Sequence, residues 1–480
     1  MAIAVALVLL VVVGVPLAFA ITRDLVVAVV LAPLVTGLQC TAAAAAMVVI
    51  GGPDLDGAPF ALWLAIVTVA SWGLAAVLVR RPRPPLPSLG VIDLVVMYGP
   101  LLLPALLVRR PPVAWDARSI WWFHAAWIDA GAATFREALG NPVFVFSHPD
   151  YPVFAPATVA GAWTVTSGSG LWVAQAVSTI LTLSAVAVFA YTVRHLVPSV
   201  SPMVARFVSL GVGLSAWAVA GDGVTAGYVD HLWAAALAAA VMLLFIGGRV
   251  VGPRGVVGGD RPLPAAGVLA LAAVLLTVAA LTKNEGLVAA AIVAVVFTVR
   301  ARRHLRRALL VWLPVAVGFA WLVVARALGA TSDLSSSPRI TQFLDGDLEP
   351  LGRAGPTLSA LAGQTGWFVG AAAVVSVIGV LALGQRRRAL GLVPVRWPWA
   401  VVAGYTVAVV ATYVVSPYAI EWHLATSIDR VSVLIVLVAA GIVASWVLVA
   451  IAPDPDRTVD RPARPRVATR PRRPPVDASR

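Results

Sequence analysis

The stretch LVVAVVLAPLVTGLQCTAAAAAMVVI, residues 25–50, contains no charged side chain and decides the class of fold. A second stretch of this kind, VSVLIVLVAAGIVASWVLVAIA, occupies residues 431–452. Both exceed the roughly 20 apolar residues that span a bilayer as a helix. Of the 480 residues, 60% are hydrophobic and 12% are charged, which is too apolar for a soluble domain. The sequence therefore predicts an all-α, polytopic integral membrane protein.

About thirteen segments qualify as transmembrane helices. The predicted spans are 2–21, 25–50, 60–79, 91–108, 171–193, 203–220, 230–248, 265–281, 283–299, 308–327, 358–384, 397–415 and 431–452. The first span ends with Ala18-Phe19-Ala20, which resembles a signal-peptidase site. Because no basic region precedes it, we interpret residues 2–21 as a membrane helix.

The arginines lie at the ends of these spans, so the formal charge of +13 does not point to nucleic acid as a partner. If Arg80, Arg81 and Arg83 are cytoplasmic, alternation of the spans places the other basic groups on the same side. These groups are Arg249, Arg254 and Arg261, the run 300–307, the triplet Arg386 to Arg388 and the carboxyl-terminal tail. We therefore predict a multi-pass cell-membrane protein with its amino terminus outside and its carboxyl terminus in the cytoplasm.

Three regions follow from this pattern. Residues 1–90 hold three leading helices, residues 91–452 form the main membrane domain, and residues 453–480 are rich in Pro, Arg and Asp. The last region predicts a disordered basic tail in weak contact with anionic membrane lipid. The single cysteine, Cys40, excludes an internal disulfide.

The outer loop 109–170 is too long for a plain connector. Four tryptophans, at 115, 121, 122 and 127, predict a helix in the membrane interface, and the short apolar stretch 153–166 predicts a second one. Asp116 precedes the first of these helices, either as an amino-terminal cap or as a general base at the water–lipid boundary. Further on, His148-Pro149-Asp150-Tyr151-Pro152 forms a turn whose polar residues either close it or serve a site.

Two more polar groups stand where predicted spans begin. Asp230 and His231 open the span 230–248, as a helix cap or as a contact to substrate or metal. Lys283 is the only lysine among 35 basic residues, and a helix that begins near Thr282 would hold it in the outer leaflet. There it either snorkels to the headgroups or binds a phosphate together with the helix end. Residues two apart do not face each other on a helix, so we expect Glu285 to be a poor partner for Lys283.

The segment 416–430 precedes the last span. If it is helical, His423, Ser427 and Arg430 share one face and form a polar stripe that either is solvated or grips an anion. The outer loop from Gly329 to Pro356 contains several acids without a motif and reads as a surface loop or lid.

Together these motifs resemble the GT-C superfamily of membrane glycosyltransferases. The resemblance rests on an early aspartate in a large first outer loop, the His148–Pro152 turn, Gly227-Tyr228-Val229-Asp230 and Thr282-Lys283-Asn284-Glu285-Gly286. It covers roughly residues 91–435. Protein mannosyltransferases, aminoarabinose transferases and actinobacterial arabinosyl- and mannosyltransferases belong to this superfamily. Many members carry paired acidic residues where this chain has Trp115-Asp116-Ala117, which leaves the role of a divalent cation open.

The resemblance implies transfer of a sugar from a polyprenyl-phosphate carrier to a hydroxyl of a glycan, lipid or protein acceptor on the extracytoplasmic face. It makes Asp116 the catalytic base, and Lys283, His423 and Arg430 the ligands of the donor phosphate. His148, Asp150, Asp230 and Glu285 would orient the acceptor or the base, and whether any residue binds a metal stays open. Three other classes stay open: a glycan polymerase or ligase that uses polyprenyl-linked donors, a transporter or flippase, and a purely structural subunit. A transporter site is expected near the bilayer midplane, where the predicted spans carry almost no ionisable residue.

Overall fold

A computed structural model of the chain describes residues 1–51, 59–81, 86–107, 110–246, 264–332 and 337–453, and all regular elements in these ranges are helical. Eight of these helices are long and apolar enough to cross a membrane. They are α1 (Ala2–Thr22), α2 (Leu25–Ile50), α3 (Phe60–Val79), α9 (Leu171–Arg194), α14 (Leu305–Ala327), α16 (Ala354–Ala389) with the preceding turn η7 (Glu349–Arg353), α17 (Arg396–Val415) and α18 (Ile420–Ile451). The prediction of an all-helical, polytopic membrane protein is confirmed.

The other five predicted spans are present as shorter helices. They are the broken segment α4 (Val91–Asp93), η2 (Leu94–Tyr98, a π-helical turn) and α5 (Gly99–Leu107), then α10 (Pro202–Leu214), α11 (Asp230–Phe245), α12 (Ala266–Thr282) and α13 (Asn284–Arg300). At 1.5 Å per residue, α11 to α13 are each about 25 Å long, less than the roughly 30 Å hydrocarbon core. The predicted span 203–220 is cut short at Leu214, because the chain continues in the 3-10 turns η5 (Ser215–Trp217) and η6 (Gly221–Val224).

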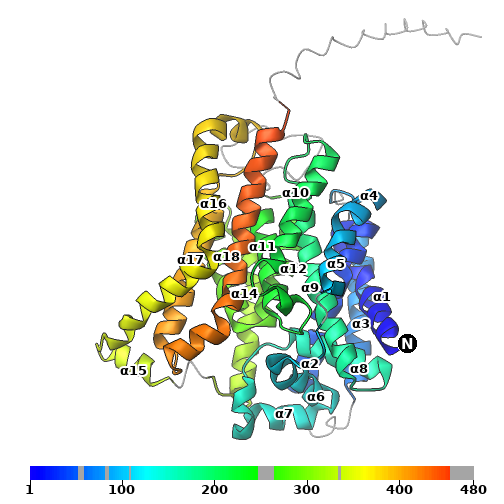
Figure 1. The fold of residues 1–480 in the computed structure, drawn as a ribbon. Helices are drawn as coiled ribbons and strands as arrows, with labels where there is room; N and C mark the ends of the chain where they lie inside the picture. The colour runs from blue at the N-terminus through cyan, green and yellow to red at the C-terminus, as the bar shows by residue number, and fades with distance from the viewer. Residues whose placement is uncertain (52–58, 82–85, 108–109, 247–263, 333–336, 454–480) are drawn as a thin grey trace, which may run out of the picture.

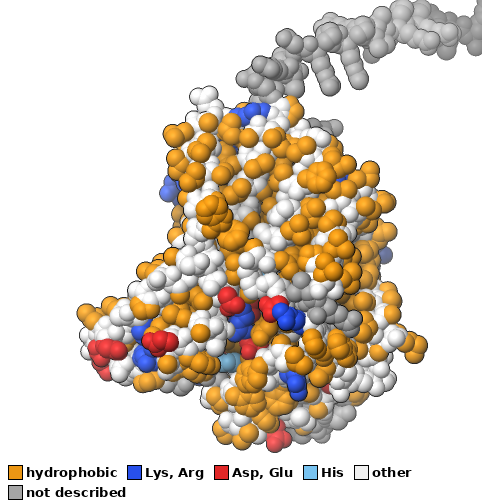
Figure 2. Space-filling view, viewed as in Figure 1, with side chains coloured by type: hydrophobic (Ala, Val, Ile, Leu, Met, Phe, Trp, Pro, Cys, Tyr) orange, Lys and Arg blue, Asp and Glu red, His pale blue; other side chains and the backbone are white. Residues whose placement is uncertain are grey.

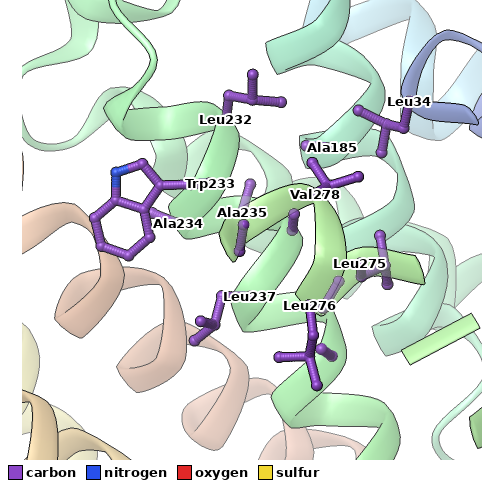
Figure 3. Packing of buried hydrophobic residues seen from close by; sticks show 14 of the residues in the cluster. Leu34, Ala185, Leu232, Trp233, Ala234, Ala235, Leu237, Leu275, Leu276 and Val278 are labelled. Atoms are coloured by element: carbon purple, nitrogen blue, oxygen red, sulfur yellow. The ribbon is translucent and has the colours of Figure 1, made fainter. Parts of the chain in front are cut away.

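The centre of the bundle is α11, whose 16 residues are all buried. Its alanine-rich sequence lets neighbouring helices approach closely, as small residues do in membrane bundles. Figure 3 shows Leu237 of α11 beside Leu276 of α12, while Val278 of α12 lies near Ala185 of α9, with Leu34 of α2 further out on the same side. The core therefore joins helices from the first half of the chain to helices from its middle.

The outer loop folds into a layer at one end of the bundle (Figure 1). It consists of η3 (Ala117–Trp121, a π-helical turn), α6 (Trp122–Asp129), α7 (Ala132–Gly140), η4 (Pro142–Ser147) and α8 (Phe154–Thr166). The two predicted helices exist, but three of the four tryptophans that were expected at the membrane interface are not exposed; Trp115 alone of the four is, at 58%. Trp121, Trp122 and Trp127 are buried, and Trp122 Nε1 donates to Ser178 Oγ of α9 at 3.3 Å. The reason is that α6 and α8 pack on each other and on the bundle, so the rings fill the interior of the layer.

Most of the segment 416–430 is also helical, but it is not a separate interfacial helix. Residues 420–430 form the first part of α18, one continuous helix of 32 residues. Alongside, the end of α16 nearest the layer leans away from the bundle and meets α15 (Pro338–Leu344), as Figure 1 shows. Apolar side chains cover most of the bundle surface in Figure 2, and charged side chains gather near the layer.

Arginines satisfy the carbonyl oxygens at several helix ends, which otherwise lack partners. Arg23 donates to carbonyl groups in the last turn of α3, and Arg136 does so at the end of α2. Arg300 and Arg353 do the same for α11 and α17. The arginines at span ends therefore also tie one helix to the next.

Several sequence interpretations fall outside the described residues. They concern Arg83, the group Arg249, Arg254 and Arg261, part of the loop from Gly329 to Pro356, and the tail apart from Pro453.

Candidate functional site

A cavity of about 780 Å³ opens between the layer and the nearby ends of α13, α17 and α18. Seven of the eight residues singled out from the sequence line it, and the eighth, Asp230, is buried beneath them in contact with two of the seven. The seven are Asp116, His148, Asp150, Lys283, Glu285, His423 and Arg430. The structure thus brings together residues from four distant parts of the sequence.

Five of these residues form an alternating row of charges, which we call the charge chain: Asp116, Arg430, Asp230, Lys283 and Glu285. Arg430 Nη1 pairs with Asp116 Oδ2 and lies 3.9 Å from Asp230 Oδ2. Lys283 Nζ lies 2.9 Å from Asp230 Oδ1 and 3.0 Å from Glu285 Oε1. With three carboxylates and two cations, the charge chain carries one net negative charge.

The middle of the charge chain is withdrawn from water. The side chains of Asp230 and Lys283 are 2% and 9% exposed, whereas those of Arg430, Asp116 and Glu285 are 17%, 22% and 26% exposed. Isolated buried charges are strongly unfavourable, so each of the two buried groups depends on its neighbours. The exposed ends of the chain remain available to a ligand in the cavity.

Lys283 reaches its partners because it is not helical. Its backbone is extended (φ −157°, ψ 153°) between the end of α12 and the start of α13. The predicted helix start near Thr282 is therefore wrong by two residues, and the expectation that Glu285 is a poor partner for Lys283 is wrong for the same reason. Gly286 permits this junction, because a Cβ there would overlap the carbonyl oxygen of Ala279.

Neither aspartate of the charge chain acts as a helix cap. Asp116 precedes the π-helical turn η3, but its side chain makes no capping hydrogen bond. For α11 the cap position is Val229, and the Asp230 carboxylate instead accepts from Lys283. The capping interpretations of both residues are therefore wrong.

The segment 148–152 forms a hydrogen-bonded turn, and its polar residues also line the cavity. The two interpretations, that its polar residues close the turn or that they serve a site, are therefore compatible. Tyr151 N donates to His148 O at 2.9 Å, and the rings of His148 and Tyr151 stack at 4.8 Å. The Tyr151 ring also stacks on Trp121 at 5.5 Å. Asp150 Oδ2 accepts a hydrogen bond of 2.9 Å from Asn284 Nδ2, while burial raises the pKa of the Asp150 carboxyl.

The polar stripe on α18 faces the cavity as the spacing predicts. Ser427 Oγ hydrogen-bonds the Tyr413 hydroxyl at 2.7 Å, and the His423 ring lies 4.3 Å from the Tyr413 ring. The guanidinium of Arg430 lies 5.0 Å from the Tyr228 ring centre. This places one imidazole and one guanidinium on the same wall of the cavity.

Three further residues line the cavity without having been predicted from the sequence: Asn284, Tyr228 and Tyr413. Asn284 lies in the motif Thr282–Gly286 next to Lys283, and Tyr228 lies in the motif Gly227–Asp230, close to Asp230. Their position beside these candidate residues was the sequence feature that could have identified them. Tyr413 ends a predicted span and carries no such signal. Its place in the site follows only from the packing of α17 against α18.

Part of the cavity lining is less polar. It includes Val288 of α13, Ala408, Val409 and Thr412 of α17, and Val431 of α18. The cavity is therefore amphipathic, because its lining combines members of the charge chain with apolar side chains of α13, α17 and α18.

The described residues contain no group of three or more His, Cys, Asp or Glu side chains arranged to hold a metal ion. The three carboxylates of the charge chain are instead engaged by Arg430 and Lys283.

The fold and the cavity thus define a polytopic membrane protein with an amphipathic, charge-lined cavity at one end of its bundle. Comparison of the chain with known protein families, curated proteins and solved structures finds no match.

Proposed function

We propose that the protein is a membrane glycosyltransferase of the GT-C type, which moves a sugar from a polyprenyl-phosphate carrier to an acceptor hydroxyl. The observation that carries the proposal is the meeting of the charge chain with an apolar wall in one cavity. A lipid-linked phosphate sugar has the matching pattern: an apolar chain, an anionic phosphate and a polar sugar. The proposal keeps thirteen spans, with α4 to α5 and α10 to α13 crossing as shorter helices, and keeps the cavity on the extracytoplasmic side.

The donor phosphate would bind between Arg430 and Lys283. An ammonium group has three N–H donors, and the ion pairs with Asp230 and Glu285 use two of them. Arg430 has five, of which those on Nη1 and Nη2 meet Asp116 and Thr426 O. Both cations therefore retain donors toward the cavity, and the prenyl chain would follow Val288 and Val409.

Asp116 is the proposed general base. It would take the proton of the acceptor hydroxyl while the new bond to the sugar forms and the bond from the sugar to the phosphate oxygen breaks. The charge that develops on the leaving phosphate would be stabilised by Arg430 and Lys283, with His423 at the rim. Without donor, Arg430 is paired with the Asp116 carboxylate. A donor phosphate that binds Arg430 in place of this carboxylate would leave Asp116 free to accept a proton.

Asp150 is the second candidate for the base. Burial raises its pKa, which brings a carboxyl closer to the range that suits proton transfer near neutral pH. Its hydrogen bond to Asn284, however, ties it to the start of α13. We assign it, with His148, to the orientation of the acceptor.

A polymerase or ligase that uses polyprenyl-linked glycans would need the same cavity and differs only in the acceptor. A transporter or flippase has less support, because its site is expected near the midplane on broken helices. Here the charge chain lies at the ends of α11 and α13 that face the layer.

The test is a transfer assay with purified protein. Lipid that copurifies is identified by mass spectrometry, and the protein is then incubated with polyprenyl-phosphate pentoses and hexoses and with alcohol, glycan and peptide acceptors. Release of polyprenyl phosphate together with a glycosylated acceptor is the expected result. Movement of these lipids across proteoliposomes without any sugar transfer would contradict the proposal.

A further inference from the structure

A second charged cluster lies at the end of the bundle opposite the cavity. Asp93 of α4 is buried, and its Oδ1 accepts from Arg194 Nε at 3.1 Å and from Arg206 Nε at 2.8 Å. Its other oxygen accepts from Gly90 N at 2.8 Å. Arg194 ends α9, whose 24 residues run about 36 Å from the layer, so the cluster stands roughly one bilayer thickness from the cavity.

Both arginines keep most of their hydrogen-bonding capacity. One carboxylate faces two guanidinium groups, which leaves one positive charge in excess. Each arginine meets Asp93 through Nε alone, and neither has a further acceptor among the described residues. The side chains of Arg194 and Arg206 are 13% and 14% exposed, so part of each side chain reaches the surface. Two pre-oriented guanidinium forks of this kind suit a phosphate.

The surroundings of the two arginines are apolar and exposed. The π-helical turn η2 packs beside α10, and α4, η2 and α10 present large hydrophobic side chains to the outside. They are Val91 (75% exposed), Ile92 (54%), Val95 (65%), Met203 (44%), Val204 (40%) and Phe207 (59%). In a membrane protein such side chains contact acyl chains, so the phosphate-binding groups sit beside a lipid-facing surface.

We propose that Arg194 and Arg206 bind the phosphate of an anionic phospholipid in the leaflet opposite the cavity. The positive charge in excess selects an anionic headgroup over a zwitterionic one, and the apolar flanks take its acyl chains. Asp93 is the positioning residue, because it fixes both guanidinium groups through Nε and leaves their Nη groups for the lipid. The bound headgroup ties the start of the broken helix α4–η2–α5 to α9 and α10.

The test is native mass spectrometry of the purified full chain titrated with phosphatidylglycerol and, separately, phosphatidylcholine. We expect tighter binding of phosphatidylglycerol, and a roughly tenfold loss of that binding in Arg206→Gln, about the effect of one charged hydrogen bond. Arg303→Gln is the matched control, because Arg303 is an exposed arginine in the turn between α13 and α14 and should bind as the parent does. Equal affinity for the two lipids, or unchanged binding in Arg206→Gln, would overturn the proposal.

Asp93→Asn separates lipid binding from folding. It keeps both arginines and removes the competing negative charge, so phosphatidylglycerol should bind at least as tightly as in the parent. Inorganic phosphate at millimolar concentration should not displace the lipid. Displacement by phosphate would mean that the cluster is a site for the free anion. Loss of phosphatidylglycerol binding in folded Asp93→Asn protein would contradict the proposal, because this variant keeps both guanidinium groups and an oxygen that can accept from them.

Discussion

Arg430 and Asp116 are separated by 314 positions in the sequence, yet the guanidinium group of Arg430 donates directly to the Asp116 carboxylate. The same guanidinium group lies 3.9 Å from Asp230, which in turn holds Lys283. Asp116 therefore rests as a paired ion at one end of the charge chain. Any anion that enters the cavity competes with it for Arg430, and the first predictions follow from this competition.

Asp116→Asn should fold and bind donor while losing at least about 100-fold in transfer rate, since an amide cannot accept the proton. Turnover is measured on purified protein next to thermal stability. Asp345→Asn is the control and should keep full activity, because Asp345 is an exposed acid that directly follows α15 and does not line the cavity. If instead Asp150→Asn abolishes transfer and Asp116→Asn is nearly normal, Asp150 is the base.

The same Asp116→Asn variant should bind polyprenyl phosphate more tightly than the parent. Removal of the carboxylate frees Arg430 and lowers the negative charge of the cavity, so we expect an affinity gain of about three- to tenfold, or roughly 1 kcal/mol. Equilibrium binding of polyprenyl phosphate measures it. Arg430→Gln should shift the affinity in the opposite direction, and weaker binding in both variants would contradict the competition.

Lys283→Met should destabilise the protein by about 3 kcal/mol or more, because it leaves Asp230 buried without its closest cation. The double variant Asp230→Asn/Lys283→Met should recover much of this loss, since it removes both buried charges. Unfolding in detergent gives the coupling free energy of the cycle. Additive effects of the two substitutions would show that the pair does not stabilise the native state.

His124 should make the protein less stable in mild acid. Its ring is buried in the layer, where Nε2 lies 3.2 Å from Ser147 Oγ, and burial lowers its pKa to about 3. The unfolded chain takes up the proton near pH 6.5, so the contribution of His124 is present above that pH and is lost as the pH falls toward 3. Between pH 7 and pH 5 the loss amounts to about 2 kcal/mol. The melting temperature of His124→Gln should therefore depend less on pH, and identical pH profiles would contradict the assignment.

The orientation in the membrane is tested with single cysteines in a Cys40→Ala background. A cysteine at Val143, which is 71% exposed in the layer, should react in intact cells with an impermeant reagent. A cysteine at Arg303 should react only after the cells are opened. Labelling of position 303 in intact cells would reverse the proposed topology.

The sequence predicts much of the fold, because an uncharged segment of 20 residues has few alternatives to a helix in lipid. It also indicates which residues meet in the cavity. Ionisable groups near the ends of apolar spans are costly in contact with lipid, so they face the protein interior or a water-filled cavity. What it does not predict depends on contacts between distant segments. The partnership of Lys283 with Glu285 requires an extended residue between two helices, and the burial of Trp122 requires α9 as a neighbour. The second cluster around Asp93 was missed because its arginines come from two other helices.

Helix α18 carries Arg430 about a third of the way along its length and contacts Arg387 through Ser445 in its last quarter, within a single rod of 32 residues, about 48 Å long. A rigid rod of this length cannot adjust its two ends independently. Hydrophobic mismatch is relieved by helix tilt at a modest free-energy cost for each ångström. The tilt that suits a given bilayer therefore also sets the height of Arg430 relative to Asp116. The thickness of the membrane thus influences the geometry of the cavity through the tilt of α18.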